Sequence, residues 1–454
     1  MLPFSLGSRF NPKTGRECVI KALRSFARRP FVRNVATVAS GTAASQAITM
    51  AFAPLITRLY GPEAFGLQGI FMSVLSLLAV IAALGYPIAI VLPKLDADAI
   101  GLVRLSILIG GCMTTLTTLT IYLLGADLLR LLNAEAIAAF IYLIPVAMFF
   151  GVLGSVLGQW LIRKKAFALS AKYGVFTTLM ISTAKAALGI LHPTAMILIV
   201  TNTVGICVGT AITYAGWRKE AAKQTATQVK QQAATLRQLA RQHVDFPLLR
   251  TPQNLINAFS QSLPVLLLAG YFGASASGQY AIALAVLGMP ASLVGSSIMA
   301  VFYPRINEAI QNGENARALI VKATAGMAAM GALPFLAVTF AGPFLFEFTF
   351  GTEWRTAGVY AQWLSLWLFL QHVNKPAVSA IPALRLQGGL LVYELFSTGA
   401  KFLALWLGFM IFKHDVTAIA LFSVSGVIAY IWLIIWVVQR SGGTNHHERT
   451  ETSR

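Results

Sequence analysis

Long apolar runs limit what this chain can fold into more than any other feature. A helix needs about 20 mostly apolar residues to cross a bilayer, and hydropathy marks twelve such runs. Lipid offers no water to unpaired backbone groups, so crossing segments must be helices or a closed barrel, and the residue alternation of a barrel is absent. We therefore predict an all-α polytopic membrane protein with twelve transmembrane helices, near residues 36–57, 66–91, 101–124, 137–159, 171–191, 194–216, 247–271, 277–302, 318–341, 356–378, 389–412 and 416–438.

The composition and the distribution of charge agree with this prediction. Hydrophobic residues make up 57% and charged residues 11% of the chain, whereas soluble domains have about 25% charged residues. A net charge of +19 would suit nucleic-acid binding in a soluble protein. With the N-terminus inside, however, 28 of the 35 Lys and Arg residues fall on one side of the predicted membrane. The positive-inside rule then places both termini in the cytoplasm, and we expect no nucleic-acid partner.

The remaining segments contain no sign of a cofactor site. Residues 17–29 put Val19, Ile20 and Leu23 on one helical face, which is typical of an amphipathic helix on the inner membrane surface. A cleaved signal peptide would look different there. The three cysteines lack the spacing of a disulfide framework or a metal site, and no glycine-rich phosphate loop is present. We predict neither a metal nor another cofactor.

One long polar interruption divides the predicted spans six and six. The sequence therefore predicts a basic N-terminal segment (1–35), an N-terminal six-helix lobe (36–216), a cytoplasmic basic linker (217–246), a C-terminal six-helix lobe (247–438) and a cytoplasmic polar tail (439–454). With an even number of spans in each half, both halves enter the membrane from the same side. The repeat is then parallel, about an axis along the membrane normal.

Two glycine-containing stretches define the repeat. LYGPEAFG (59–66) and YFGASASG (271–278) both follow the first span of a half. Aligning Gly61 with Gly273 fixes an offset of 212 residues between the halves, and Gly66 is then aligned with Gly278. We expect both stretches to be external turns between the first two helices of each half.

The same offset pairs polar residues in the helices before these turns. Thr42 falls on Asn254, Ser45 on Asn257 and Thr49 on Gln261. Positions three and four apart lie on one helical face, so each half has a polar stripe. Such residues also join helices through hydrogen bonds of about 0.6 kcal/mol each, but recurrence in both halves favours the lining of a cavity.

Charged residues inside spans are the other candidates for function, because they usually face a wet interior. They are Lys185, Arg250, Glu394 and Lys401, three cations and one carboxylate, which biases the interior toward anions. Structural alternatives stay open. Arg250 and Lys185 lie near the ends of their spans and could extend to the headgroups, and Glu394 and Lys401 could each pair with a neighbouring helix.

Residues 40–94, which begin SGTAASQAITMAFAPL, and residues 255–309, which begin LINAFSQSLPVLLLAGYFG, resemble oligosaccharide flippases of the Wzx type. These belong to the multidrug/oligosaccharidyl-lipid/polysaccharide (MOP) exporter superfamily. The resemblance implies two six-helix lobes around a central cavity. It also implies transport of undecaprenyl-diphosphate-linked oligosaccharides across the bacterial inner membrane for O-antigen, capsule or exopolysaccharide synthesis. One departure is Gly85-Tyr86-Pro87, since many relatives have a charged pair flanking this tyrosine.

Under this resemblance the interior residues acquire roles. Arg250, Lys401 and Lys185 would attract the diphosphate near Glu394, while the amides and hydroxyls of the two stripes would bind sugar hydroxyls. The chain would be a transporter and not an enzyme, working by alternating access. Its partners would be the lipid-linked oligosaccharide, membrane lipids, a polysaccharide polymerase and a chain-length regulator.

Three other classes of membrane protein fit the sequence less well. A cation-coupled multidrug exporter of the same superfamily is expected to hold a carboxylate in its first helix, and residues 34–60 contain none. A lipid II flippase typically has fourteen spans and arginines in its first helix. A polytopic glycan polymerase or ligase usually carries a long external loop, whereas the longest here is residues 343–356. The sequence leaves open the glycan, the coupling ion, the surface polymer and the oligomeric state.

Overall fold

The computed structural model describes residues 30–131, 134–221, 234–384 and 386–451, and all of its regular elements are helices. The predicted amphipathic segment at 17–29 and residues 222–233 of the predicted linker lie outside the described residues. Nine of the described helices are long and apolar enough to cross a membrane. The all-α, multi-pass membrane fold is therefore confirmed. These nine are α2 (Pro30–Ala82), α4 (Asp96–Leu131), α5 (Leu143–Arg163), α6 (Phe167–Leu191), α7 (Ala195–Ala221), α9 (Thr251–Gln311), α10 (Ala316–Phe350), α13 (Gln387–Leu407) and α14 (Asp415–Glu451). One further long helix is α11 (Arg355–Val373).

Two of these helices are much longer than one membrane crossing. Helix α2 has 53 residues and α9 has 61, against the roughly 20 that a crossing requires. Each is interrupted by one glycine with positive φ: Gly61 has φ 65° and ψ 172°, and Gly273 has φ 86° and ψ 171°. L-residues avoid this region and glycine does not. The two glycines paired by the sequence offset thus break their helices in the same way.

These breaks are more compact than the predicted turns. Only Gly61 and Gly273 leave the helical conformation inside the two long helices. Pro62 follows the first break directly, where its missing N–H costs no hydrogen bond because a helix leaves its first N–H groups unpaired. One glycine therefore replaces a turn of several residues.

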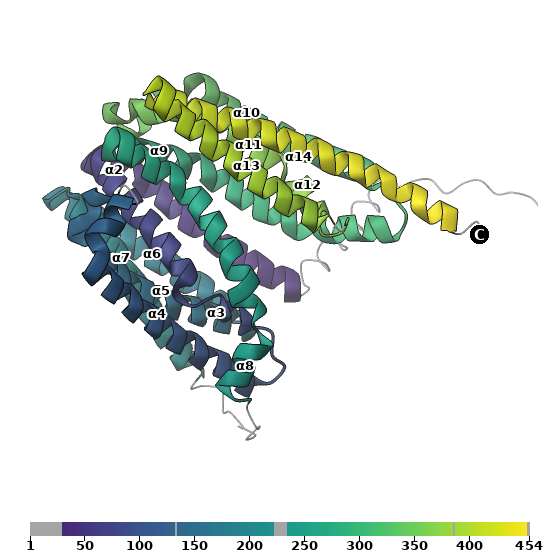
Figure 1. Cartoon of the computed structure of the whole chain (residues 1–454), viewed down its shortest axis with the longest axis horizontal. Coiled ribbons are helices and arrows are strands. Elements are labelled where there is room, and N and C mark those ends of the chain that lie inside the picture. The colour runs from purple at the N-terminus through teal and green to yellow at the C-terminus, as the bar shows by residue number, and fades with distance from the viewer. Residues whose placement is uncertain (1–29, 132–133, 222–233, 385, 452–454) are drawn as a thin grey trace, which may run out of the picture.

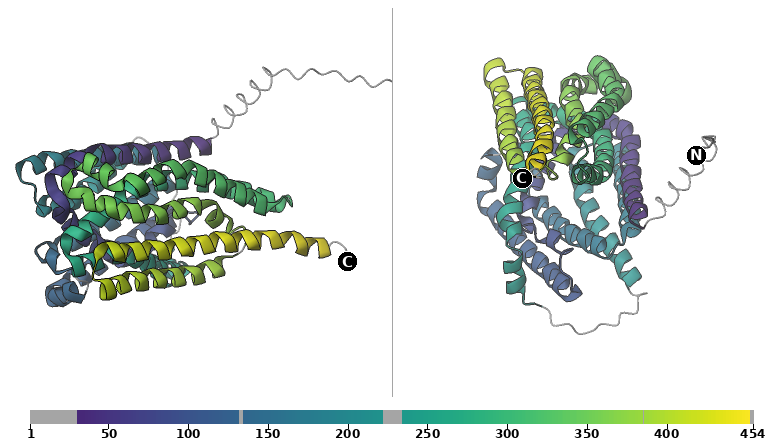
Figure 2. Two further views of the ribbon diagram at one scale, coloured as in Figure 1. Left: turned by 90° about the horizontal axis from the view of Figure 1, so that it is seen from above. Right: turned by 90° about the vertical axis from the view of Figure 1, so that its right-hand side faces the viewer.

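The helices form two groups (Figures 1 and 2). The N-terminal lobe contains α2 to α8, and the C-terminal lobe contains α9 to α14. The lobes meet mainly through α2 and α9. They lie close together where α2 and α9 are broken by Gly61 and Gly273, an end called the glycine end below. They diverge toward the end where α2 begins and α14 finishes, called the terminal end.

A short helix, α8 (Leu236–Gln242), fastens the chain between the lobes to the N-terminal lobe. It starts with a capping box of Thr235 and Gln238, which satisfies two free N–H groups. Its Leu239 is 1% exposed and fills the space over Gly101, where an added methyl carbon would lie 2.4 Å from Leu239 Cδ1. Tyr86 donates a hydrogen bond of 3.2 Å to the Ala240 carbonyl. Tyr86 thus has a structural role in holding α8.

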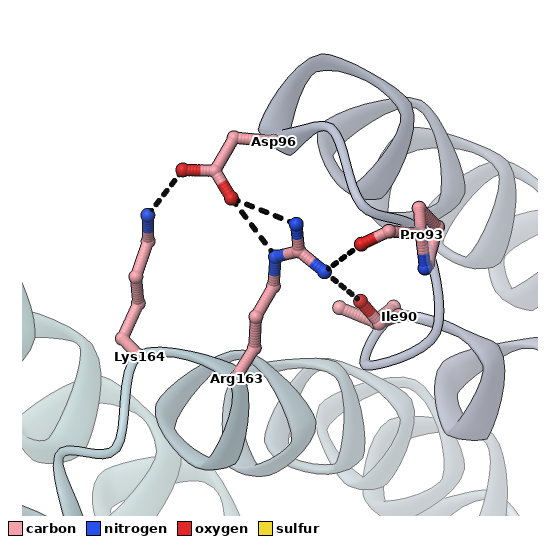
Figure 3. A network of polar contacts seen from close by, with 5 residues as sticks. All are labelled: Ile90, Pro93, Asp96, Arg163 and Lys164. Atoms are coloured by element: carbon pink, nitrogen blue, oxygen red, sulfur yellow. Dashed lines mark hydrogen bonds and ion pairs between the residues drawn. The ribbon is translucent and has the colours of Figure 1, made fainter.

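An ion-pair network holds the terminal end of the same lobe together (Figure 3). Asp96, the first residue of α4, accepts hydrogen bonds from Arg163 Nε and Nη2 at 3.0 and 2.8 Å and also binds Lys164. Arg163 Nη1 donates to the carbonyls of Pro93 and Ile90 at 2.7 and 3.3 Å. One guanidinium therefore ties α5 to α4 and to the segment between α3 (Tyr86–Ala89) and α4.

Candidate functional site

A cavity of about 630 Å³ lies within the C-terminal lobe. Its wall is made by Arg250, by parts of α9 on both sides of Gly273, by the end of α11 with the adjoining α12 (Lys375–Ala380), and by α13 and α14. The polar part of the wall consists of Arg250, Gln253, Asn254, Asn257, Ser260, Gln261, Gln371, Asn374, Lys375, Glu394, Ser397, Thr398 and Lys401.

The predicted stripe on α9 lines this cavity. Arg250, Asn254, Asn257 and Gln261 all belong to its wall, as their spacing of three and four residues on one helical face predicts. Gln261 Nε2 donates a hydrogen bond to Asn257 Oδ1. An amide has both a donor group and an acceptor group, so each of these two side chains keeps one for a ligand.

The charged residues predicted on α13 also reach the cavity. Glu394 and Lys401 belong to its wall, and Lys401 Nζ lies 5.7 Å from the centroid of the Trp367 ring. A cation over an indole face is held electrostatically by the ring. Together with Arg250 and Lys375, these residues give the wall three cations and one carboxylate. The cavity is therefore positive and suited to an anion.

The candidate residues of the N-terminal lobe do not line this cavity. Thr42 donates to the Val38 carbonyl and Thr49 to the Ser45 carbonyl, each at 3.0 Å within its own helix. Lys185 lies on α6, where its backbone carbonyl accepts a 2.7 Å hydrogen bond from Tyr60. The structure thus brings the α9 and α13 candidates together and leaves Thr42, Ser45, Thr49 and Lys185 elsewhere.

Several cavity residues were missed by the sequence analysis. Gln371, Asn374 and Lys375 line the wall, and Gln371 donates to the Tyr430 hydroxyl at 3.1 Å. The signal was the polar run QHVNK at 371–375, near the end of an apolar span. The wall also has an aromatic part that hydropathy alone does not distinguish from core, comprising Tyr280, Trp367, Tyr393, Phe422 and Tyr430.

The lobes are joined at the glycine end by polar contacts that the sequence did not reveal. Arg58 Nη2 donates to the Phe348 carbonyl at 2.9 Å, and Trp354 Nε1 donates to the Thr57 carbonyl at 3.0 Å. The Trp354 ring meets Phe65 edge to face with centroids 5.4 Å apart. We call Thr57, Arg58, Phe65, Phe348 and Trp354 the glycine-end latch. It closes the space between the lobes at that end.

Beside the latch, the two lobes touch backbone to backbone. A methyl carbon added to Gly66 would lie 1.7 Å from the Ala274 carbonyl oxygen, and one added to Gly278 would lie 1.9 Å from the Pro62 carbonyl oxygen. Gly66 corresponds to Gly278, and Pro62 to Ala274, at the offset of 212 residues. The contact is thus reciprocal, and neither glycine leaves room for a side chain.

The comparison with protein families identifies the chain. The profile of the polysaccharide biosynthesis protein family matches residues 55–358, well over half of the sequence. The chain belongs to that family. A comparison with curated proteins gave no match.

Solved structures similar to this member of the polysaccharide biosynthesis family are membrane transporters. An inward-facing multidrug resistance MATE transporter of the MOP superfamily is 15% identical, with 88% of this chain and 96% of that chain covered and a TM-score of 0.63. The lipid II flippase MurJ in an inward closed conformation is 12% identical, with 90% and 89% covered and a TM-score of 0.66. A mutant of the Vibrio cholerae MATE transporter VcmN is 18% identical, with 90% and 95% covered and a TM-score of 0.51.

At these identities the structural likeness establishes the fold, which is of the MATE and MurJ type. It confirms the predicted resemblance to the MOP superfamily, and the family match adds polysaccharide biosynthesis. Among the described residues, no group of three His, Cys, Asp or Glu side chains could hold a metal ion.

Proposed function

We propose that this protein flips oligosaccharides linked to undecaprenyl diphosphate from the inner to the outer leaflet of the bacterial inner membrane. The observation that carries the proposal is the cavity of the C-terminal lobe, whose wall combines Arg250, Lys375 and Lys401 with amides and hydroxyls. Because the chain belongs to a polysaccharide biosynthesis family and has a transporter fold, a lipid-linked glycan is the substrate that best fits this wall.

The chemistry of the wall matches the two parts of such a head group. A diphosphate carries negative charge, and charge interactions strengthen as the dielectric constant falls. Arg250 offers the planar donor fork that suits phosphate oxygens. The amides of Asn254, Asn257 and Gln261 present both donors and acceptors, as sugar hydroxyls require. The undecaprenyl chain would remain in the bilayer, where its apolar surface avoids water.

The topology that accompanies this proposal has twelve crossings. Helices α2 and α9 each cross twice, with Gly61 and Gly273 at the outer surface, and α11 crosses once beside them. Both termini and the terminal end are cytoplasmic, as the excess of Lys and Arg there favours. The structure then corresponds to a state with lobes spread toward the cytoplasm, which agrees with its similarity to an inward-facing MATE transporter.

Transport would proceed by rocking of the lobes about the cavity. Opening the outer side requires the glycine-end latch to break, including the bonds from Arg58 to Phe348 and from Trp354 to Thr57. Each such bond is worth about 0.5–1.5 kcal/mol. This is small enough for substrate binding to shift the balance between the two states.

A second candidate is a cation-coupled multidrug exporter. The structural similarity to MATE transporters favours it, and Glu394 is the carboxylate of the cavity wall that could take up a cation. The three cations of the same wall argue for an anionic substrate instead.

The test is complementation of a strain in which the gene is deleted. An Arg250→Ala, Lys401→Ala double variant, expressed at the wild-type level, is expected to lose surface polysaccharide. The matched control Lys322→Ala removes an exposed cation of α10 outside the cavity and should restore it. Full restoration by the double variant would refute the role of the cations. Drug efflux from vesicles without any effect on surface polysaccharide would support the exporter.

A further inference from the structure

The cavity of the C-terminal lobe has an opening between α13 and the part of α9 that precedes Gly273. Both helices contribute to the cavity wall, yet they scarcely touch each other, and α13 packs mainly on α14. In Figure 1 the two helices diverge toward the terminal end, on the near side of the molecule. Both belong to candidate membrane spans. The opening therefore lies at the depth of the bilayer.

The N-terminal lobe shows the same pair of helices in a closed arrangement. Helices α2 and α6 hold the places in their lobe that α9 and α13 hold in the other, and they pack closely. A methyl carbon added to Gly41 would lie 2.5 Å from Ala171 Cβ, and Tyr60 donates a 2.7 Å hydrogen bond to the Lys185 carbonyl. At the offset of 212 residues, Gly41 corresponds to Gln253, which lines the cavity. A close contact of small residues in one lobe is thus replaced by a long polar side chain in the other.

Apolar side chains stand at the mouth of this opening. Ile256 of α9 and Leu395 of α13 belong to the cavity wall, yet they are 48% and 52% exposed. We call these two residues the portal rim. Next to them and outside the wall, Phe259 and Phe396 are 45% and 76% exposed. Apolar surface avoids water, so an edge of this kind suits a hydrocarbon chain and not a hydrated sugar.

Cations of the cavity wall lie a short way inside the rim. Arg250 is six residues from Ile256, and Lys401 is six residues from Leu395, each about 9 Å along its helix. A ligand that meets both the rim and these cations has an anionic head and an apolar chain. A diphosphate carries more negative charge than the single phosphodiester of a phospholipid. The pair of features therefore favours a lipid diphosphate over the phospholipids around it.

We infer that the gap between α9 and α13 is a lateral portal, through which the polyisoprenyl chain of the substrate extends into the bilayer while its diphosphate occupies the cavity. The inference rests on the proposed function, because it concerns the same cavity and the same substrate. It adds the path of the chain, which leaves through the C-terminal lobe itself and not through the space between the lobes. Ile256 and Leu395 contact the chain on either side.

The experiment is photo-cross-linking of the full-length protein in lipid nanodiscs. The nanodiscs contain phosphatidylethanolamine and phosphatidylglycerol with a small share of undecaprenyl diphosphate. Benzoylphenylalanine replaces Leu395, and mass spectrometry identifies the lipids attached after illumination. Undecaprenyl diphosphate is expected to exceed its share of the lipid mixture at least about tenfold among these adducts. One hydrogen bond to a charged group, worth about 1.5 kcal/mol, already gives that preference.

The same helix offers a matched control. Leu403 of α13 is 51% exposed, nearly the same as Leu395, but it is not part of the described cavity wall. Benzoylphenylalanine in place of Leu403 should attach lipids in proportion to the mixture. A second arm adds Arg250→Ala to the protein labelled at position 395. If the cation holds the head of the lipid whose chain passes the rim, the enrichment should fall about tenfold.

The outcomes separate this inference from the proposed function. Native mass spectrometry of the same protein first measures binding of undecaprenyl diphosphate, and a lack of binding would refute both proposals. Binding without enrichment at position 395, or with equal enrichment at position 403, would refute the portal and leave the flippase standing. Enrichment of phosphatidylglycerol at position 395 would mean that a phospholipid occupies the gap, which also refutes the portal.

Discussion

The two lobes share a backbone plan but differ in what their matching stripes do. On α9, Asn257 and Gln261 extend into a cavity, whereas on α2 the Thr49 hydroxyl bonds to its own helix through the Ser45 carbonyl. A short hydroxyl side chain can donate its hydrogen bond to the carbonyl one turn before it in the same helix. A longer amide has groups left over for a ligand. The same register of polar residues therefore gives a lining in one lobe and a self-satisfied helix in the other.

The feature that the lobes share should be the most sensitive to substitution. Gly66→Ala and Gly278→Ala each drive a methyl group into a backbone carbonyl of the other lobe, and overpacking costs about 1–3 kcal/mol or more. Both variants should lose most folded protein or unfold well below the wild-type temperature, measured by thermal unfolding in detergent. Gly111→Ala, with open space around it, is the control. If only one of the two glycines were sensitive, the reciprocal contact would be wrong.

The next prediction compares the effect of removing one lysine from each lobe. Lys375 lines the cavity and Lys185 does not. A hydrogen bond to a charged group contributes about 1.5–3 kcal/mol, so Lys375→Ala should weaken binding of undecaprenyl diphosphate at least tenfold. Lys185→Ala should change it less than twofold. Native mass spectrometry of both variants checks this, and equal losses would mean that the N-terminal lobe also holds the diphosphate.

A smaller difference in transport is expected between substitutions at equivalent positions of the two polar stripes. Asn257→Ala removes an amide from the cavity wall, and Ser45→Ala changes the equivalent position on α2. One or two lost hydrogen bonds of about 1 kcal/mol each should reduce transport of lipid-linked oligosaccharide about 5- to 30-fold for Asn257→Ala. For Ser45→Ala the rate should be nearly unchanged. Transport into vesicles is the measurement. Slow transport by the Ser45→Ala variant would indicate that the stripes of both lobes bind the substrate.

The smallest expected effect concerns the equilibrium between the state that is closed at the glycine end and the state that is open there. Trp354→Phe deletes the hydrogen bond to the Thr57 carbonyl and keeps an aromatic ring against Phe65. Losing about 1 kcal/mol should raise the population open at the glycine end about fivefold, as measured by distances between spin labels on the two lobes. Arg355→Ala removes an ion pair with Glu347 inside one lobe and should leave the distances unchanged. A shift of similar size in this control would remove the latch from the mechanism.

Much of this molecule could be predicted from the sequence. Apolar runs of the right length determine an all-α membrane fold, because few other structures satisfy the backbone in lipid. Gly61 and Gly273 were recognisable because a position with positive φ demands glycine. Residues on α9 and α13 could be assigned to one interior because charge and amides in a span usually face away from lipid.

Other parts could not be predicted, for physical reasons. Helical spacing shows that Thr42, Ser45 and Thr49 share a face, but not which neighbouring helix that face meets. Lys375 was missed because a lysine near the end of a span ordinarily extends to the headgroups. The latch depends on the carbonyls of Thr57 and Phe348, and backbone acceptors leave no mark in a sequence.

The reciprocal contact of Gly66 and Gly278 also bears on how such a chain could arise. In an isologous interface, residue i of one copy meets residue j of the other, and j meets i. Gly66 meets Ala274 while Gly278 meets Pro62, which is that arrangement inside a single polypeptide. A half-length ancestor could therefore have closed the same interface with a second copy of itself. Fusion would then have freed the two polar stripes to diverge, so that one lines a cavity and the other bonds within its own helix.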